Sequence, residues 1–322
     1  MLSLCNVKRE TVNSLSIVIP SYNRGEVLLG TIASLTKQSS LADEIIIVDQ
    51  TDYSSVDENV LIRLQEMDDQ CVIRYIQRTE PSIPKAMNVG LLSATSQFVL
   101  FLDDDIEIAI DFLEQHKRLL LEHDAYAHVG QVLQPGEYEK KIPRNYDSGK
   151  GLYKDLSFVF SSSESRDIHN CMAGNLCVDR LTAIKAGGFD ENFIGSAYRF
   201  ETEFCRRMIR FSGRPFYYSP KPVIHHLQCP TGGTRNTDHF LSSSSPRHSV
   251  GDYYFAMRES EPSSILPYCL RRLFGCLKAR FYLRKPWYLP VRFIGEVRGF
   301  LLARRLCEQG PRFCVDTPVK LK

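Results

Sequence analysis

The segment FVLFLDDDIE, Phe98–Glu107, decides the fold. Its first five residues form a short apolar run, which is typical of a strand buried on both faces of a sheet. Asp103, Asp104 and Asp105 follow at once, and adjacent carboxylates repel one another unless they are solvated or neutralised by a cation. In an extended chain Asp103 and Asp105 project to the same side, so both could approach one ion. Hard oxygen ligands suit Mg²⁺ or Mn²⁺, and the alternative interpretation is a solvated acidic turn.

Three earlier apolar runs have the same outline. They are SIVIP at Ser16–Pro20, EIIIV at Glu44–Val48 and VIRYI at Val72–Ile76, with helical spacing between them. Alternating strands and helices predict parallel pairing in an α/β sheet that is covered on both faces. Polar residues follow these runs, and ligands of open α/β sheets bind at the carboxyl ends of strands. The first 105 residues therefore predict a ligand-binding site at one edge of the sheet.

The middle of the chain adds a carboxylate at the start of a predicted helix, Phe200–Phe211. Glu201 lies near the positive end of that helix dipole, where a carboxylate stays ionised and can accept a proton from a hydroxyl. The alternative is an ordinary acidic residue at a helix start. A later extended run ends in His225 and His226, whose rings alternate between opposite faces. At most one of them is expected to face a metal, and either could be purely structural.

Together these pieces resemble the family-2 glycosyltransferases, which have the GT-A fold. The resemblance covers about Leu15 to His226 and depends on the order of seven segments. These are Ser16–Arg24, Glu44–Asp52, Pro84–Ala94, Phe101–Asp105, Ala186–Phe193, Glu201–Phe204 and Pro220–His226. It implies a nucleotide-diphospho-sugar transferase fold, with a mostly parallel central sheet flanked by helices and a helical C-terminal extension. The expected divisions are a nucleotide-sugar-binding half at 1–110, an acceptor-binding and catalytic half at 111–240, and a basic extension at 241–322.

The resemblance also implies roles for the matched residues. The nucleotide side would comprise Pro20, Ser21, Tyr22, Asn23, Asp49, Lys85, Asn88 and Asp104. The metal would be held by Asp103, Asp105 and His226, the last matching better than His225. Gly187 and Gly188 would line the acceptor side. Glu201 would be the catalytic base.

The chain departs from the family pattern near the expected base. Phe200-Glu201 replaces the usual Glu-Asp pair, so Glu203 remains an alternative base. Met87 replaces a frequent arginine, and Lys85 is the candidate for the missing positive charge. Glutamate and aspartate have similar pKa values, so the base chemistry is unaffected by the exchange.

These residues fit one reaction, the inverting, metal-assisted transfer of a sugar from a nucleotide diphosphate to a hydroxyl of a saccharide or lipid-linked acceptor. One alternative is a sugar-nucleotide-binding or membrane-associated scaffold protein without activity. Another is a nucleotidyltransferase, which usually has a glycine-rich loop after the first strand, where this chain has PSYNRGE with one glycine. No Gly-rich phosphate-binding motif occurs, so a phosphate site built from a metal is expected.

The last quarter of the chain is basic. Residues 240–322 carry 15 Lys and Arg against 6 Asp and Glu, whereas the whole chain has a net charge of only +2. Arginines and lysines interleaved with aromatic residues and leucines between Ile265 and Leu306 predict helices that lie on an anionic membrane. Helices packed on the catalytic domain are the alternative. The acidic remainder argues against nucleic acid as a partner.

The sequence also bears on location. We find no run of about 20 apolar residues and no secretory signal, and the ten cysteines include no C-x-x-C pair. A protein in the cytoplasm, at the cytoplasmic face of the membrane, is therefore the expectation.

Overall fold

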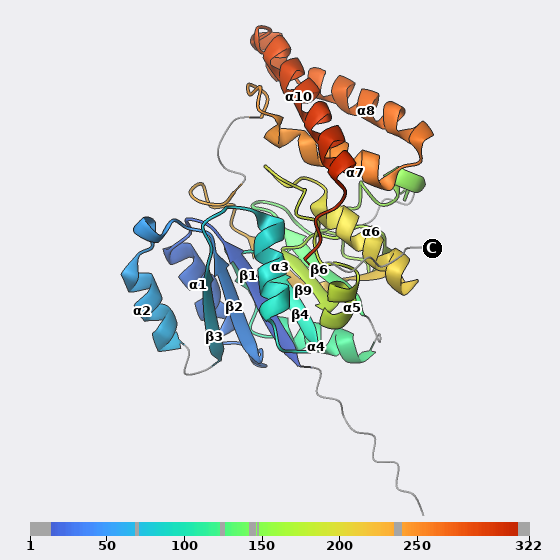
Figure 1. The fold of residues 1–322 in the computed structure, drawn as a ribbon. Helices are drawn as coiled ribbons and strands as arrows, with labels where there is room; N and C mark the ends of the chain where they lie inside the picture. The colour runs from blue at the N-terminus through green and yellow to red at the C-terminus, as the bar shows by residue number, and fades with distance from the viewer. Residues whose placement is uncertain are drawn as a thin grey trace, which may run out of the picture.

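A single mixed sheet forms the body of the molecule. The computed structural model describes residues 14–67, 71–122, 126–141, 146, 148–234 and 240–314. The strands lie in the order β3-β2-β1-β4-β8-β6-β9-β5, and β7 pairs with β9 (Figure 1). Their bounds are β1 Leu15–Ser21, β2 Glu44–Asp49, β3 Val72–Gln77, β4 Phe98–Leu102, β5 Ile106–Ile108, β6 Ala127–Leu133, β7 Arg166–Ile168, β8 Asn175–Asp179 and β9 Phe216–His226.

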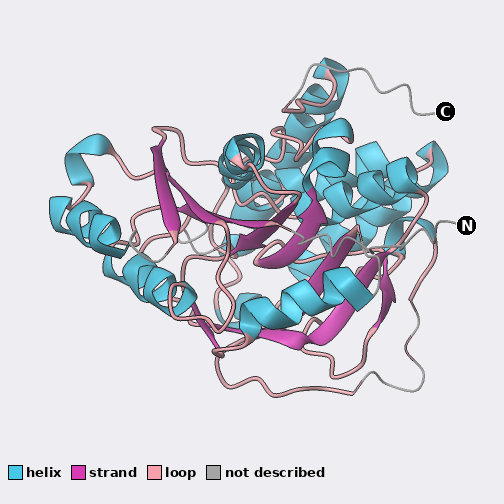
Figure 2. Ribbon diagram, turned by 90° about the horizontal axis from the view of Figure 1, so that it is seen from below, coloured by secondary structure: helices cyan, strands magenta, loops and turns pink. Residues whose placement is uncertain are grey.

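Helices cover both faces of this sheet, as the view from below shows (Figure 2). Those of the body are α1 Glu26–Leu35, α2 Glu58–Met67, α3 Ile83–Ser93, α4 Phe112–Glu122, α5 Arg180–Lys185 and α6 Phe200–Ser212. The C-terminal helices are α7 Val250–Glu259, α8 Pro262–Leu277, α9 Phe281–Arg284 and α10 Tyr288–Gln309. Short 3-10 turns occupy η1 Tyr53–Ser55, η2 Gly151–Tyr153 and η3 Pro246–His248.

The first four strands pair in parallel, as the alternating pattern predicts. β1 lies between β2 and β4. Its register begins with Ser16 opposite Glu44 on β2 and with Leu15 opposite Phe98 on β4. Every residue of β2 and β4 is buried, which explains their continuous apolar runs. Parallel pairing brings the carboxyl ends of β1, β2 and β4 to one edge of the sheet.

Beyond β4 the sheet becomes mixed. β8 pairs antiparallel with both β4 and β6, and β5 pairs antiparallel with β9. Because β5 and β9 come from opposite sides of residue 110, one sheet runs through both of the predicted halves of residues 1–240. That division remains a prediction of the sequence.

The sequence pattern does not predict β6, although all seven of its residues are buried. The strand contains His128, Gly130 and Gln131, so it lacks a continuous apolar run. Its polar side chains find partners inside the protein. A ring nitrogen of His128 lies 2.8 Å from His116 on α4, and Gln131 Nε2 donates to the Ser162 carbonyl at 2.9 Å. Hydrogen bonding therefore compensates for the burial of these polar groups. The same groups interrupt the apolar pattern, which is why the sequence does not predict this strand.

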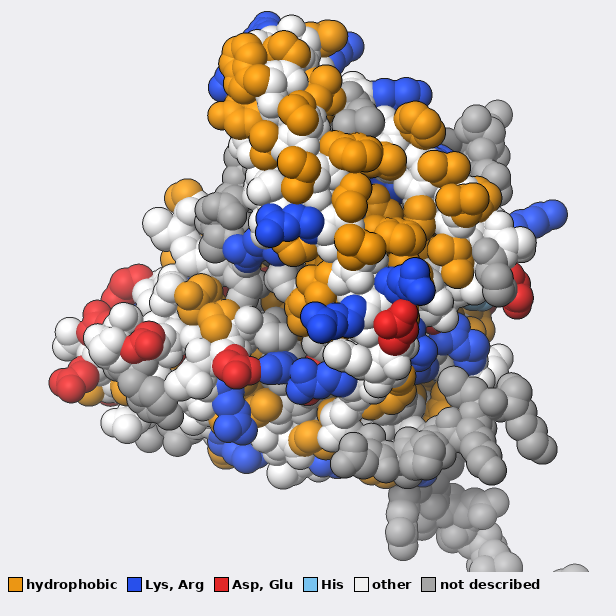
Figure 3. Space-filling view, turned by 45° about the horizontal axis from the view of Figure 1, so that its top comes forward, with side chains coloured by type: hydrophobic (Ala, Val, Ile, Leu, Met, Phe, Trp, Pro, Cys, Tyr) orange, Lys and Arg blue, Asp and Glu red, His pale blue; other side chains and the backbone are white. Residues whose placement is uncertain are grey.

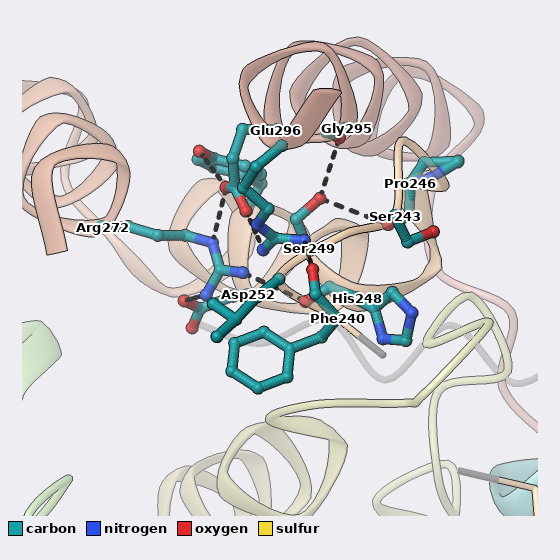
Figure 4. A network of polar contacts seen from close by, with 12 residues as sticks. Phe240, Ser243, Pro246, His248, Ser249, Asp252, Arg272, Gly295 and Glu296 are labelled. Atoms are coloured by element: carbon teal, nitrogen blue, oxygen red, sulfur yellow. Dashed lines mark hydrogen bonds and ion pairs between the residues drawn. The ribbon is translucent and has the colours of Figure 1, made fainter. Parts of the chain in front are cut away.

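The C-terminal helices form a unit above the carboxyl edge of the sheet (Figure 1). Buried ion pairs join three of them: Arg272 on α8 binds Asp252 on α7, and its Nε lies 3.1 Å from Glu296 on α10 (Figure 4). Glu296 also pairs with Arg292 one turn earlier. No helix in the described part of the chain is both long enough and apolar enough to cross a membrane.

After α10 the chain returns to the body as a short strap, Gly310–Cys314. The Glu191 amide donates to the Arg312 carbonyl at 2.9 Å, and the Cys314 amide donates to the Gly187 carbonyl at 2.9 Å. The Phe313 ring lies 4.4 Å from the Arg207 guanidinium. The strap therefore fastens the C-terminal unit to the turn between α5 and α6.

Candidate active site

A pocket of about 580 Å³ opens at the carboxyl edge of the parallel strands. Most of the residues around it come from β1, from the acidic segment after β4, from the start of α6 and from the segment after β9. The predicted site residues that line it are Pro20, Ser21, Tyr22, Asp103, Asp104, Asp105, Glu201 and His226. The fold thus brings together, in one cavity, predicted site residues that lie up to 206 positions apart in the sequence.

Asp103, Asp105 and His226 lie together on one wall of the pocket. His226 Nε2 is 3.0 Å from Asp105 Oδ1 and 3.8 Å from Asp103 Oδ2. Pairing of β5 with β9 sets this contact, since Ile106 lies opposite His226 in the register. Gly174 keeps the space for Asp103, because a Cβ at that position would lie 2.1 Å from Asp103 Oδ2.

Acidic neighbours stabilise the protonated form of His226. The hydrogen bond to Asp105 raises the pKa of His226, and the charges of Asp103 and Asp105 add to this effect against the cost of burial. The other ring nitrogen, Nδ1, lies 3.0 Å from Gln134 Oε1. Two acceptors at the two ring nitrogens favour an imidazolium, in which both nitrogens donate.

Arg24 provides the second positive charge of the cluster. Its Nε lies 3.3 Å from Asp104 Oδ1 and its Nη2 lies 3.1 Å from Asp105 Oδ2. The same guanidinium donates through Nη1 to the carbonyl of Thr231 at 2.7 Å. Burial raises the pKa of Asp104 to about 7, with Arg24 and a hydrogen bond from Ser21 Oγ acting in the opposite direction. Arg24 thus holds the acidic segment against the loop that follows β9.

The acidic cluster fits a divalent cation that shares its ligands with a substrate. Among the described residues, no three His, Cys, Asp or Glu side chains are arranged as a complete metal cage. Mg²⁺ typically takes one or two protein carboxylates and completes its shell with phosphate oxygens and water. Asp103 and Asp105 offer these hard oxygen ligands, and the His226 ring lies beside both.

The two candidate bases of α6 have different surroundings. Glu201 lines the pocket, and its Oε1 accepts a 3.3 Å hydrogen bond from the Ala173 amide. Glu203 is buried and does not line the pocket. Its carboxylate receives two hydrogen bonds from Arg207, of 2.7 and 2.8 Å. Of the two, only Glu201 is placed where it could meet a substrate in this pocket.

Four of the eight residues assigned to the nucleotide side lie outside the pocket lining: Asn23, Asp49, Lys85 and Asn88. Asp49 accepts hydrogen bonds from Thr51 and from the Tyr75 hydroxyl at 2.6 Å. Asn23 has a left-handed backbone with φ 54°, and its amide donates to Thr51 Oγ1 at 2.8 Å. Lys85 pairs with Glu80. Asp49 and Asn23 are engaged with Thr51, and Lys85 with Glu80, whereas Gln50 and Met87 reach the lining.

Asn88 and the two glycines assigned to the acceptor side meet one another, and none of them lines this pocket. Asn88 Oδ1 accepts from the Phe189 amide at 2.7 Å, and its Nδ2 donates to the Phe189 carbonyl at 2.8 Å. Gly187 and Gly188 have φ of 101° and 67°. A Cβ at Gly187 would lie 2.8 Å from the Phe313 ring, and one at Gly188 would lie 2.5 Å from Cys314 Sγ. The C-terminal strap therefore covers the surface that the sequence assigned to an acceptor.

Sequence reasoning gave no role to several residues of the pocket. Arg24 ends the SYNR segment, so its place beside the predicted nucleotide loop was a usable signal. Gly174, Gln134 and Tyr198 carry no local motif, and only the folded chain brings them to the site. A second hollow, lined by residues 135–140, contains none of the predicted groups.

This arrangement, with an open α/β sheet, an acidic segment after β4 and a pocket at the strand ends, is that of the GT-A sugar-nucleotide transferases. The structure matches that of Staphylococcus aureus TarS 1–349 in complex with UDP-GlcNAc, with a TM-score of 0.57 and 15% identity over 90% of this chain and 81% of that one. It also matches a mannosyltransferase of Pyrobaculum calidifontis in complex with GDP-Man and Mn²⁺, with a TM-score of 0.52 and 18% identity over 92% and 79%.

The family model described as glycosyl transferase family 2 matches residues 16–180, just over half of the chain. The chain therefore belongs to this family.

Two curated relatives show which kinds of protein share this sequence. A Campylobacter jejuni GalNAc(5)-diNAcBac-PP-undecaprenol beta-1,3-glucosyltransferase is 34% identical over 146 residues, 44% of each protein. Escherichia coli chondroitin synthase is 28% identical over 183 residues, 56% of this chain and 24% of the relative. The chain thus matches 44% of the length of the first of these relatives and 24% of the length of the second.

Proposed function

We propose that the protein is an inverting, metal-assisted glycosyltransferase that moves a sugar from a nucleotide diphosphate to a hydroxyl of a saccharide or lipid-linked acceptor. The observation that carries this proposal is the shared pocket of Asp103, Asp105 and Glu201. It combines ligands for a cation with a carboxylate that can accept a proton.

The donor would lie along the segment after β1. Ser21 and Tyr22 line the pocket beside the acidic cluster, where a diphosphate would meet Asp103 and Asp105. Bound there, Mg²⁺ or Mn²⁺ supplies a Lewis acid that neutralises charge on the leaving diphosphate. The UDP-GlcNAc and GDP-Man complexes of the structural neighbours support a nucleotide sugar as donor.

Glu201 would act on the acceptor. Its place at the first turn of α6 favours the ionised carboxylate, which can take the proton of an attacking hydroxyl. Attack from the face opposite the leaving diphosphate inverts the anomeric carbon. Glu203 would position Glu201, since its pairing with Arg207 ties α6 to the Ala186 and Gly188 carbonyls.

A donor panel tests the activity. Nucleoside diphosphate release from UDP- and GDP-sugars is measured with Mn²⁺, with Mg²⁺ and with EDTA, using water as the acceptor. We expect turnover of at least one donor and its loss in EDTA. Binding of a donor without turnover under any condition would instead favour the non-catalytic sugar-nucleotide-binding protein.

Glu201→Gln tests the base. We expect sugar transfer to fall by about 10²–10⁴-fold, the usual contribution of general base catalysis. Glu164→Gln is the matched control, because Glu164 is exposed and outside the pocket lining. Unchanged transfer by Glu201→Gln would remove Glu201 from the mechanism.

We further propose that the C-terminal helices rest on an anionic membrane, at the cytoplasmic face, where a lipid-linked acceptor would lie. Large apolar side chains are exposed along them, with lysines and arginines at their margins (Figure 3). The exposed residues are Leu266, Leu270, Phe274, Leu283, Trp287, Phe293, Ile294, Val297 and Leu301. On α8 these recur every four residues, as on an interfacial helix. The relative that acts on an undecaprenol-linked saccharide supports such an acceptor.

The single tryptophan of the chain reports on this contact. Trp287 is 63% exposed, so insertion into a bilayer would shift its emission to the blue. We expect this shift with vesicles of 30% phosphatidylglycerol in phosphatidylcholine, and a weaker one in 0.5 M salt because screening shortens the reach of the basic residues. Phe274→Asp should reduce binding, whereas Leu181→Asp on α5 should not. Absence of both the shift and flotation with vesicles would contradict membrane contact.

A further inference from the structure

Tyr198 is an exposed aromatic side chain inside the pocket, three residues before Glu201. It lines the cavity together with Phe200 and Met172, and 46% of its surface is accessible. The same pocket is lined by the acidic cluster and by further apolar side chains, among them Ile83, Met87 and Leu102. Tyr198 and Phe200 come just before Glu201 in the chain, so they place aromatic rings next to the proposed base.

The backbone is strained on both sides of Tyr198. Ala197 has φ 51° and Arg199 has φ 73°, a left-handed conformation that is uncommon for residues with a side chain. Such conformations persist where the surrounding structure enforces them, and they concentrate at functional sites. Two of them around one exposed ring indicate that the position of this ring matters.

The C-terminal unit enforces this conformation. The amide and the hydroxyl of Ser196 both donate to the Arg247 carbonyl, at 3.1 and 2.9 Å. Gly251 on α7 packs so closely that a Cβ there would lie 2.4 Å from the Tyr198 carbonyl oxygen. Arg199 Nε lies 3.4 Å from Asp252, a member of the buried network of Figure 4.

One face of the Tyr198 ring is already covered. The Arg199 guanidinium carbon lies 4.6 Å from the ring centroid, at a cation–π distance. The accessible surface of the ring must therefore belong mainly to its other face and its edge. An aromatic face fixed from behind offers a flat apolar surface at little entropic cost.

We propose that Tyr198 is the platform on which a sugar ring of the acceptor stacks, so that one of its hydroxyls reaches Glu201. The inference rests on the proposed function and adds its acceptor subsite. Pyranose rings present apolar C–H faces, which pack on the electron-rich face of an aromatic ring, while their hydroxyls stay at the rim. The C-terminal unit holds the backbone around this ring in place, so the platform also links that unit to the acceptor.

Steady-state kinetics test the platform with Tyr198→Ala and Tyr198→Phe. The acceptors are p-nitrophenyl α- and β-glycosides of glucose, galactose, N-acetylglucosamine and N-acetylgalactosamine, with the donor that the hydrolysis panel identifies. For Tyr198→Ala we expect the acceptor KM to rise about three- to tenfold while the donor KM is retained. Tyr198→Phe should restore the acceptor KM to within about twofold, since it keeps the ring. Tyr138→Ala, which removes an exposed tyrosine outside the pocket, is the control.

Other results would overturn the platform. A rise in the donor KM would mean that the ring contacts the nucleotide, and a loss in kcat alone would mean a structural role. A wild-type protein that hydrolyses donors but uses none of the glycosides would also contradict it. Absence of donor hydrolysis counts against the proposed function itself, which keeps the two failures distinct.

Discussion

Two clusters of charged side chains in this molecule use similar residues to different ends. In the pocket, Asp103, Asp104 and Asp105 face one arginine, Arg24, and one histidine, His226. In the C-terminal unit, Asp252 and Glu296 face three arginines, Arg199, Arg272 and Arg292. Carboxylates are in excess in the first cluster and guanidinium groups in the second.

The two clusters differ in whether they open on a cavity. The C-terminal cluster is closed: Glu296 also accepts a 2.7 Å bond from the Tyr253 hydroxyl, and Arg292 donates to the Phe240 carbonyl. The pocket cluster opens on a cavity, and Asp103 is 42% exposed there. Excess negative charge beside a cavity attracts a cation, whereas a network closed among protein groups only fastens helices. Variants in the two clusters should therefore fail in different ways.

Asp103→Asn should give the largest effect, and it should be on activity. Removing one cation ligand is expected to lower sugar transfer about 10³-fold, since metal assistance is worth several kcal/mol. The free energy of unfolding should change by less than about 1 kcal/mol, because the substitution relieves carboxylate repulsion at a partly exposed site.

Donor turnover, Mn²⁺ titration and urea unfolding together check this separation. Asp167→Asn on β7, exposed and outside the pocket lining, is the control. Full activity with unchanged Mn²⁺ affinity in Asp103→Asn would show that the two clusters do not differ in the way described.

Glu296→Gln should give the opposite result, a loss of stability. Arg292 and Glu296 are each 1% exposed, so the substitution leaves a buried guanidinium without its carboxylate partner. We expect a cost of roughly 3 kcal/mol in the free energy of unfolding, measured by urea denaturation. A loss below about 1 kcal/mol would mean that the C-terminal network is less closed than its contacts indicate.

How far the sequence predicts this molecule depends on the range of the interactions involved. The bounds of β4 agree with the expected apolar run to the residue, because burial on both faces leaves a continuous apolar pattern. The meeting of Ser21 with the acidic segment followed from the rule that parallel strands share a carboxyl edge. These are local patterns combined with one general rule of topology.

The choice between Glu201 and Glu203 needed the fold. Helical residues turn by about 100° each, so two positions apart they point to nearly opposite sides. Only one could face the pocket, and the packing of α6 decides which. The covering of Gly187 by Phe313 is equally beyond the sequence, since 126 residues separate them and no pattern links them. β6 was missed because its buried polar residues depend on distant partners.

A buried histidine, His116, is neutral where the two clusters are charged. It predicts an effect of intermediate size on the free energy of unfolding. His116 is fully buried against His128 and Asn175, and burial lowers its pKa to about 3. In the unfolded chain the pKa is about 6.5, so below that pH the unfolded state binds a proton that the folded state does not. The wild-type protein should lose about 2 kcal/mol of stability from this group between pH 6.5 and pH 5.

Urea unfolding of the wild type and His116→Gln at pH 7 and pH 5 isolates this contribution. The drop in stability should be about 2 kcal/mol smaller in the variant, whatever the other titrating groups contribute to both proteins. Equal drops would mean that His116 takes up its proton in the folded state as readily as in the unfolded one.

The exposed pair of Arg63 and Glu26 should give the smallest effect and so sets the lower end of the comparison. Arg63 Nη1 lies 2.7 Å from both carboxylate oxygens, a closer contact than that between Arg24 and Asp105, yet the two side chains are 46% and 70% exposed. Water screens the attraction, and ordering two long side chains offsets it. Arg63→Gln should therefore change the free energy of unfolding by about 0.5 kcal/mol or less, measured by urea denaturation in low and high salt. A loss above about 1 kcal/mol would contradict the view that burial, and not distance, decides what an ion pair contributes in this protein.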